Sequence, residues 1–161
     1  MGGHMKIYIM GSTGVGKTYL SKKLSKKYNI KTYELDRIVY DQENISVHRS
    51  DEEIKKSFNE IINKDDWIIE DIGRQRFKKG REMCDKIYYI KKSKYKTYKQ
   101  MMKRWNKQRK DLEDYNIKPT VKNLFKQLND VRVYKKLEKG LLKELKAYED
   151  KLIIINKLNS N

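Results

Sequence analysis

Short runs rich in apolar and aromatic residues recur along the chain, and each is bounded by polar residues or glycine. Most are continuous rather than alternating, which is typical of strands covered on both faces. Such strands predict a parallel sheet with helices on each side, that is, an α/β fold. The predicted strands are Met5–Met10, Lys31–Leu35, Trp67–Ile69, Lys86–Ile90 and Leu152–Ile155.

The segments between these runs have the periodicity of amphipathic helices. A helix over Lys17–Tyr28 places Leu20, Leu24 and Tyr28 on one stripe. Residues 50–53 (SDEE) form a capping box, which marks the start of a second helix. The apolar stripe of that second helix consists of Ile54, Phe58, Ile61 and Ile62.

Helical patterns also dominate the second half of the chain. One helix has a predicted core stripe of Tyr95, Tyr98, Met101, Met102 and Trp105, opposite a solvated face of Lys96, Lys99, Lys103, Arg104 and Lys107. A loop over Asp111–Thr120 follows, with the only proline at position 119. Two further helices are then predicted, one from Val121, Leu124, Phe125 and Leu128 and the other from Tyr134, Leu137, Leu141, Leu145 and Tyr148.

The length of 161 residues suits one domain, which we expect to span residues 5–161. Residues 1–4 (MGGH) look like an expression-vector remnant before a native start at Met5. No apolar run of about 18 residues and no signal peptide is present, so we expect a soluble, cytoplasmic protein. The single cysteine, Cys84, excludes a disulfide framework and a zinc site. We interpret it as a small half-buried residue rather than a catalytic thiol.

The chain is strongly basic, with 39 Lys+Arg against 22 Asp+Glu and a formal net charge of +17. This charge suits an anionic partner, either a nucleotide or a nucleic acid. Lysine, asparagine, isoleucine and tyrosine are all abundant, however, which is also what a compositional drift of the source genome produces. The charge therefore predicts non-specific, salt-dependent polyanion binding rather than a specific partner.

Residues 11–18 (GSTGVGKT) fit G-x-x-x-x-G-K-[ST], the phosphate-binding P-loop, and lie between a predicted strand and a predicted helix. The glycines let successive backbone N–H groups point inward around an anion. Lys17 can reach the β- and γ-phosphates, and the Thr18 hydroxyl can join the shell of Mg²⁺. The expected ATP-binding residues are Gly11, Ser12, Thr13, Gly14, Val15, Gly16, Lys17, Thr18 and Tyr19.

Acidic residues follow two other predicted strands, at the end where parallel sheets bind ligands. Glu70 and Asp71 come after Trp67–Ile69, where a carboxylate would hold Mg²⁺ or accept a proton. Asp36 and Arg37 come after the second strand, and Asp36 could accept a proton from a substrate hydroxyl. The alternative interpretation is that these residues are ordinary solvent-exposed residues of surface turns.

Three arginines are further candidates. Arg74 follows Glu70 closely and could clamp a phosphate or a carboxylate bidentately. Arg104 and Arg109 lie near the end of the basic helix, where an arginine on a closing segment could neutralise a transferring phosphoryl group. The alternative for both is a solvated helix face.

Four stretches carry a resemblance to a known family. They are residues 11–28 (GSTGVGKTYLSKKLSKKY), 33–41 (YELDRIVYD), 67–77 (WIIEDIGRQRF) and 84–109, which end in an arginine-bearing helix. On these stretches the chain resembles the small adenylate-kinase-like P-loop kinases, and within them it is most similar to the group called DNA topology modulation proteins. The resemblance departs at Asp71, where the family has glycine, at Gly73, and at residues 90–94 (IKKSK), which lack the family's aspartate.

The resemblance implies a three-layer P-loop NTPase fold of the nucleoside monophosphate kinase type, with a parallel sheet of about five strands. It implies a substrate-binding insertion over residues 36–63 and a lid-like segment over about 104–120. Arg74 would then bind the acceptor, and Arg104 and Arg109 would occupy lid-side positions. The guanine-specifying N-K-x-D motif of GTPases does not follow a predicted strand here, which favours ATP over GTP.

These observations predict an Mg-ATP-dependent kinase that phosphorylates a nucleotide or a similar hydroxyl- or phosphate-bearing acceptor. Lys17, Asp36, Arg104 and Arg109 would be catalytic. Asp36, Arg37 and Arg74 would bind substrate, and Thr18 with Glu70 or Asp71 would bind the metal. The alternatives are a polynucleotide 5′-hydroxyl kinase and a nucleotide-regulated DNA- or RNA-binding protein with little turnover. No membrane partner is expected.

Overall fold

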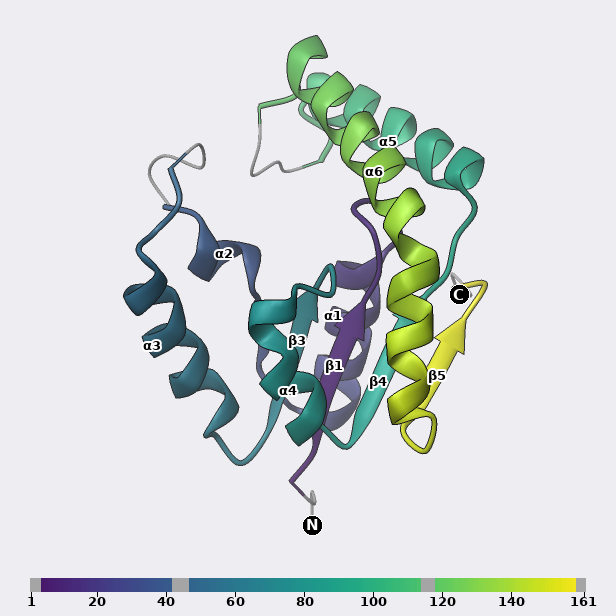
Figure 1. Cartoon of the computed structure of the whole chain (residues 1–161). Coiled ribbons are helices and arrows are strands. Elements are labelled where there is room, and N and C mark those ends of the chain that lie inside the picture. Colours follow the sequence, from purple (N-terminus) through teal and green to yellow (C-terminus); the bar gives the residue numbers. More distant parts are fainter. Residues whose placement is uncertain (1–3, 42–46, 114–117, 159–161) are drawn as a thin grey trace.

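Parallel strands form one sheet in the order β2-β3-β1-β4-β5 (Figure 1). The computed structural model describes residues 4–41, 47–113 and 118–158. Every predicted strand is present within a residue or two of its expected position. The strands are β1 (Lys6–Met10), β2 (Thr32–Glu34), β3 (Trp67–Asp71), β4 (Lys86–Ile90) and β5 (Leu152–Ile155).

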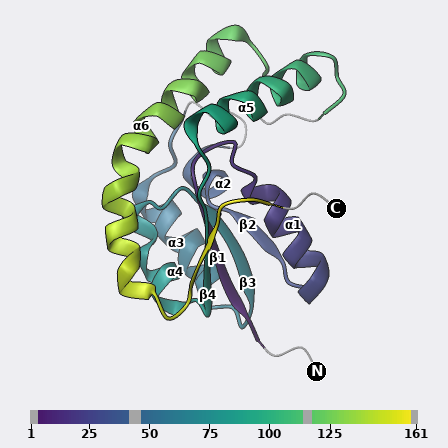
Figure 2. The same ribbon diagram turned by 90° about the vertical axis from the view of Figure 1, so that its right-hand side faces the viewer.

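Helices cover both faces of this sheet, as the continuous apolar runs predicted (Figure 2). Side chains alternate across β1, so that Ile7 and Ile9 face α1 while Tyr8 and Met10 face the other helices. The helices are α1 (Lys17–Tyr28), α2 (Asp36–Val39), α3 (Asp51–Ile62), α4 (Lys78–Met83), α5 (Lys94–Arg109) and α6 (Val121–Leu145), with 3₁₀ turns η1 (Gln75–Phe77) and η2 (Lys146–Tyr148).

The register of the sheet determines which residues meet at its upper edge. Met10 of β1 lies opposite Asp71 of β3, and Glu34 of β2 lies opposite Glu70. The strands are parallel, so their carboxyl ends meet at one edge. The segments that follow β1, β2 and β3 therefore converge there.

Two predicted helices begin as their sequences indicate. α1 starts at Lys17, so the last two residues of the P-loop form its first turn. α3 starts after Ser50, whose hydroxyl accepts a hydrogen bond from the Glu53 N–H, while the Glu53 carboxylate accepts one from the Ser50 N–H at 3.0 Å. The capping box thus satisfies two N–H groups at the start of α3.

Other expectations are corrected by the structure. The two helices predicted after residue 120 are one helix, α6, of 25 residues, because no proline or helix-stopping turn separates their apolar stripes. The predicted core stripe of α5 is only partly buried: Met101 is buried, but the exposed fractions of Tyr95 and Met102 are 75% and 39%. α5 stands above the sheet edge and so has less surface to pack against (Figure 2).

The edges of the sheet are less covered than its centre. β5 is an edge strand, and the exposed fractions of Ile153 and Ile154 are 40% and 47%, so two-sided burial is wrong for this strand. The short helices α2 and α4 were not predicted, since four to six residues are too few for helical periodicity to be recognised. None of the helices in residues 4–41, 47–113 and 118–158 is long and apolar enough to cross a membrane.

Candidate active site

The P-loop connects β1 to α1 at the upper edge of the sheet (Figure 1). Gly14 and Gly16 adopt φ angles of 77° and 107°, which side-chain-bearing residues rarely adopt. These angles turn the chain back so that it enters α1 at Lys17. The Lys17 ammonium group donates hydrogen bonds to the carbonyl oxygens of Gly11 and Ser12, both at 3.0 Å.

Lys17 is the charged group around which the site's acids gather. Burial lowers the pKa of Lys17, and the nearby carboxylates of Asp36, Glu70 and Asp71 oppose that shift. The acids predicted after β2 and β3 therefore lie close enough to Lys17 to stabilise its positive charge. The remaining loop positions differ in exposure: Ser12 is buried, whereas Thr13 and Tyr19 are exposed.

Glu70 connects β3 to the first turns of α1. The Thr18 hydroxyl donates to Glu70 Oε2 at 3.0 Å, and the Ser21 hydroxyl donates to Glu70 Oε1. Only 5% of Glu70 is exposed. Burial raises the pKa of Glu70, and the hydrogen bonds from Ser21 and Thr18 oppose that rise. Ser21 was not predicted as a site residue, since its polar spacing on α1 is that of an ordinary helix residue.

The Thr18–Glu70 pair fits the requirements of Mg²⁺ bound with a nucleotide. Mg²⁺ in kinase sites takes one or two protein oxygens, and phosphates and waters complete its shell. A hydroxyl and a carboxylate 3.0 Å apart supply such oxygens beside the P-loop. The described residues contain no cluster of three or more His, Cys, Asp or Glu side chains that could hold a metal alone. The metal would therefore depend on the nucleotide.

Asp71 is fully engaged within the protein. Its Oδ2 accepts hydrogen bonds from the N–H groups of Gly73 (2.8 Å) and Arg74 (2.7 Å) and from the Tyr8 hydroxyl (3.2 Å). Its Oδ1 accepts from the Arg74 guanidinium at 2.5 Å. The side chain is completely buried. These contacts give Asp71 the role of fixing the turn after β3, which leaves Glu70 as the better placed metal ligand.

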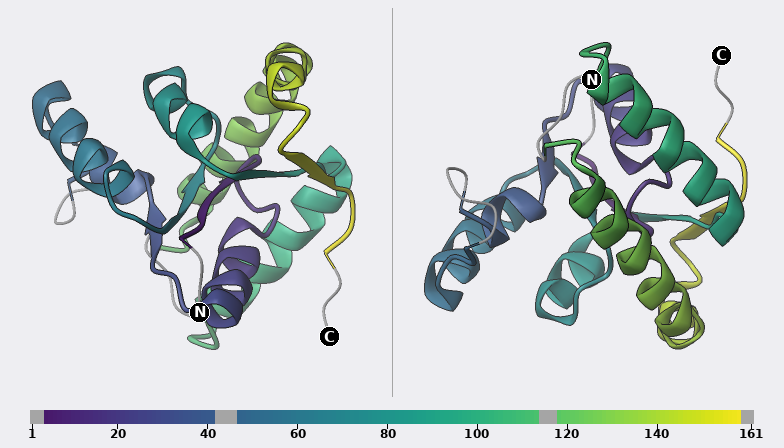
Figure 3. Two further views of the ribbon diagram at one scale, coloured as in Figure 1. Left: turned by 90° about the horizontal axis from the view of Figure 1, so that it is seen from below. Right: turned by 90° about the horizontal axis from the view of Figure 1, so that it is seen from above.

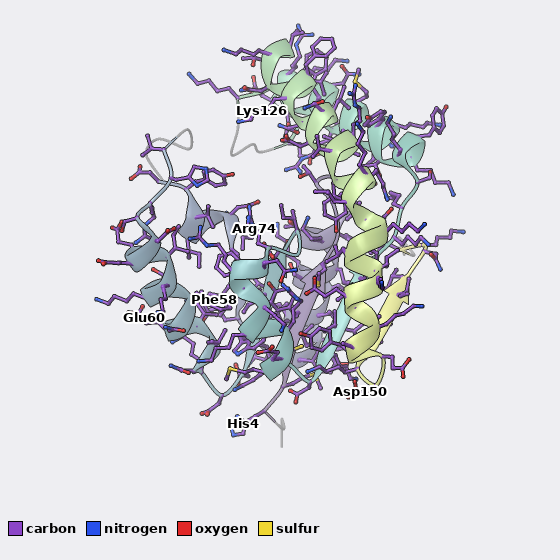
Figure 4. The ribbon with its side chains drawn as sticks, viewed as in Figure 1. His4, Phe58, Glu60, Arg74, Lys126 and Asp150 are labelled. Atoms are coloured by element: carbon purple, nitrogen blue, oxygen red, sulfur yellow. The ribbon has the colours of Figure 1, made fainter. Side chains whose placement is uncertain are left out.

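Arg74 joins Asp71 to Asp36, two acids from different strand ends. Its second guanidinium nitrogen pairs with Asp36 Oδ1 at 2.5 Å. Burial disfavours the charge of Arg74, but the carboxylates of Asp71 and Asp36 outweigh it and raise the Arg74 pKa. Arg74 lies at the top of α4, between α2 and α6 (Figure 4). The structure therefore brings Asp36 and Arg74 together, 38 residues apart in sequence.

Arg37 occupies a different position from its neighbour Asp36. Its Nε pairs with Glu34 at 3.5 Å, and its side chain is 58% exposed. The Arg37 guanidinium therefore contacts an acid of β2.

α5 packs directly on the P-loop. A Cβ atom placed on Gly14 would lie 2.7 Å from Met101 Cγ, so only glycine fits beneath this side chain. Lys92 lies two residues before α5, and its ammonium group donates to the carbonyl of Val15 at 3.4 Å. Seen from above, α5 crosses over α1 (Figure 3).

The two predicted lid arginines lie on α5, C-terminal to Met101, the residue that contacts the P-loop. Arg104 follows Met101 by three residues, which places it on the same side of α5, and its Nε pairs with Glu113 at 3.2 Å. Arg109 lies over the ring of Trp105, 4.7 Å from its centroid. Part of the predicted lid, residues 114–117, and part of the predicted insertion, residues 42–46, lie outside the described residues.

Sequence reasoning missed a completely buried arginine. Arg81 on α4 donates to the Arg74 carbonyl at 3.0 Å and pairs with Glu144 of α6 at 3.2 Å. It thereby supports the loop that carries Arg74. No signal in the sequence identified it, because Arg81 lies in a short helix among other charged residues. Cys84 is inert: it is 4% exposed, and burial raises its thiol pKa to about 12.

A cavity of about 380 Å³ opens beside this loop, between residues 72–75 and α6. Its walls include Arg74, Tyr134 and Leu137. It gives the Arg74 side of the site a space that is partly polar and partly apolar.

The fold is shared with solved structures of small kinases. A gluconokinase from Sinorhizobium meliloti 1021 superimposes with a TM-score of 0.62 at 13% identity, over 99% of this chain and 86% of that one. A shikimate kinase from Bacteroides thetaiotaomicron gives 0.57 at 15% identity, over 94% and 86%. An uncharacterised protein from Eubacterium ventriosum ATCC 27560 gives 0.51 at 18% identity, over 97% and 91%.

At these identities the similarity shows the fold alone, and the predicted three-layer P-loop NTPase fold is confirmed. No protein-family model matches the chain, and no curated protein sequence matches it either.

Proposed function

We propose that this protein is an ATP-dependent phosphotransferase that transfers the γ-phosphoryl group of ATP to a hydroxyl group of a small molecule. The observation that carries this proposal is the convergence of three elements at one sheet edge. These are the P-loop, the Thr18–Glu70 pair and the Asp36–Arg74 pair. The shared fold with proteins named gluconokinase and shikimate kinase supports the same class of reaction.

On the nucleotide side, the loop amides and Lys17 would hold the phosphates. Thr18 and Glu70 would hold Mg²⁺, which, when bound, supplies positive charge to the phosphate oxygens. Glu70 is favoured over Asp71 because Asp71 already accepts four hydrogen bonds within the protein.

On the acceptor side, Asp36 would accept the proton of the attacking hydroxyl as its oxygen bonds to the γ-phosphorus and ADP leaves. Asp36 suits this role because its side chain is 62% exposed at the start of α2, just beyond β2. The Arg74 guanidinium already pairs with two carboxylates, so these three groups carry a net charge of about −1. That charge disfavours a phosphorylated acceptor and favours a neutral hydroxyl-bearing one.

Arg104 is the better candidate for the arginine that contacts the transferring group. It lies one turn beyond Met101, the residue that contacts the P-loop, whereas Arg109 is stacked on Trp105. For this role α5 and residues 104–120 would act as a lid, and residues 36–63 would act as the acceptor-binding insertion. Both remain proposals.

Two alternatives are tested by the same experiment. The exposed lysines of α5 would suit a nucleic acid, either as substrate of a polynucleotide 5′-hydroxyl kinase or as ligand of a nucleotide-regulated binding protein. The resemblance to DNA topology modulation proteins favours the second alternative and is itself a proposal.

The test is transfer of label from γ-labelled ATP to a panel of acceptors: sugars and polyols, hydroxy acids, nucleosides, nucleoside monophosphates and 5′-hydroxyl oligonucleotides. We expect labelling of a small, non-phosphorylated hydroxyl acceptor that depends on both Mg²⁺ and Lys17. Labelling of the oligonucleotide alone would establish the polynucleotide kinase instead.

The control is the Lys17→Ala variant assayed on the whole panel. If no acceptor is labelled by the wild type and ATP hydrolysis is the same in both proteins, the kinase proposal is wrong. Tight oligonucleotide binding with a steep salt dependence and no labelling would then favour the binding protein.

A further inference from the structure

A second cavity, of about 350 Å³ and lined mainly by lysines, lies next to the P-loop but outside the site described above. The segment after β4, the helix α6 and Asn156 after β5 form its walls, so it is not the surface of a single helix. Its charged lining is Lys91, Lys92, Lys94, Lys96, Lys135 and Glu138. Five cations therefore face one carboxylate.

The one carboxylate is already neutralised. Glu138 accepts hydrogen bonds from Lys135 at 2.7 and 2.9 Å and from the Tyr89 hydroxyl at 2.7 Å. The charge of Lys135 is thereby balanced, and no second acid lines the cavity within the described residues. Within the part of the chain that the structure describes, no acid is paired with a lysine of the segment after β4.

The lysines of this segment differ in what they contact. Lys92 donates to the Val15 carbonyl and to the Gln100 side chain, both neutral groups. Burial lowers its pKa, and the positive charge of Lys96 lowers it further. Lys91 and Lys96 are exposed, and among the described residues neither is paired with an acid. Like charges are therefore held close together around a concave space.

We propose that this cavity binds a phosphate-bearing anion, at a site separate from the P-loop. A compact polyanion would neutralise Lys91, Lys92 and Lys96 together, and the cavity is large enough for a phosphate or pyrophosphate group. The lysines of the lining would not attract a neutral ligand electrostatically, and they would repel a cationic one. The proposal does not rest on the kinase activity: the lining includes no P-loop residue and neither member of the Thr18–Glu70 and Asp36–Arg74 pairs, although Lys94 and Lys96 lie on α5, the proposed lid.

The test is isothermal titration calorimetry with inorganic pyrophosphate, in a Lys17→Ala background that weakens binding at the P-loop. The test variant adds Lys91→Ser and Lys96→Ser, and the control variant adds Lys55→Ser and Lys56→Ser on the exposed face of α3. Both remove two positive charges, so they change the net charge equally. The buffer contains about 50 mM NaCl, where the screening length exceeds about 10 Å.

We expect pyrophosphate to bind to the Lys17→Ala protein, with affinity reduced about tenfold or more in the Lys91/Lys96 variant and less than about twofold in the Lys55/Lys56 control. Equal losses in the two variants would show attraction by net charge alone, and the proposal would be wrong. No detectable binding in the Lys17→Ala protein would also overturn it. Circular dichroism melting curves check that all variants are folded. The result of the pyrophosphate titration does not decide the result of the acceptor-labelling assay.

Discussion

The P-loop follows β1, the central strand of the sheet, whereas Asp36 follows β2, a strand at its edge. The acid of the nucleotide side is buried, and neighbouring strands build that side: Glu70 is 5% exposed and reaches Thr18 and Ser21 across the β1–β3 pair. The acceptor side is more open, and its Asp36–Arg74 pair joins the start of α2 to the loop after β3. The fold therefore fixes the nucleotide side, while the acceptor side depends on a few side chains that can differ between proteins of one fold.

The largest expected effect is that of Lys17→Ala. Removal of the ammonium group should lower phosphoryl transfer about a hundredfold to a thousandfold, because a preorganised charge at the transferring group is lost. Initial rates with labelled ATP measure this. Lys23→Ala on the exposed side of α1 is the charge-matched control and should behave as wild type. Equal rates for the two variants would contradict the assigned role of the P-loop.

Asp36→Asn tests whether the nucleotide side and the acceptor side of the site are independent. We expect turnover with an acceptor to fall about a hundredfold, since a proton acceptor is lost. ATP affinity, measured by calorimetry, should change less than about twofold. Asp65→Asn, in the exposed turn before β3, is the matched control. A comparable loss of ATP affinity in Asp36→Asn would show that the two sides are not independent.

The pH range of activity should be narrower than the range that an exposed glutamate and an exposed lysine would give. Burial raises the pKa of Glu70, which must be ionised to hold the metal, so activity should fall on the acid side above the pH at which an exposed glutamate titrates. Burial lowers the pKa of Lys17, which must be protonated, so activity should fall on the alkaline side below the pH of an exposed lysine. Each limb should approach about tenfold per pH unit.

The pH–rate profiles of variants identify the two groups. Lys17→Arg keeps a charge that does not titrate in this range, so the alkaline limb should disappear or move to higher pH. Glu70→Gln should lose the acid limb together with most of the response to Mg²⁺. Unchanged limbs in these variants would assign the profile to other groups.

The smallest expected effect on activity concerns the support of the acceptor side. Glu144→Leu leaves the buried Arg81 without its acid, which should lower the free energy of unfolding by about 2–4 kcal/mol. Because Arg81 holds the Arg74 carbonyl, KM for the acceptor should rise while ATP affinity stays the same. Urea denaturation gives the stability, and Glu149→Leu on the surface is the control. Equal stability of the two variants would contradict the structural role of this pair.

The sequence predicted the parts of the fold that depend on local signals. The sheet followed from continuous apolar runs, α1 from the position of the P-loop, and α3 from its capping box. The helix stripe of α5 was predicted as core because periodicity reports an apolar face but not how much surface lies opposite it. Tyr95 is exposed for that reason.

The sequence named several of the residues that the fold brings together at the sheet edge, but not their pairings. Glu70, Asp36 and Arg74 were candidates from their places after strands. The engagement of Asp71 by Tyr8, 63 residues away, and that of Arg81 by Glu144, also 63 residues away, have no local signal. Such contacts appear only once the strand order is known.

The contact between Met101 and Gly14 has a mechanical consequence. Methionine is unbranched and has three rotatable bonds, so its thioether can stay in contact with the glycine while α5 changes its tilt. The contact can thus serve as a pivot with a fixed position and a variable angle. A β-branched side chain would hold one angle. With α5 as the proposed lid, Met101→Ile should therefore leave the protein folded but slow nucleotide release, measured in stopped-flow experiments.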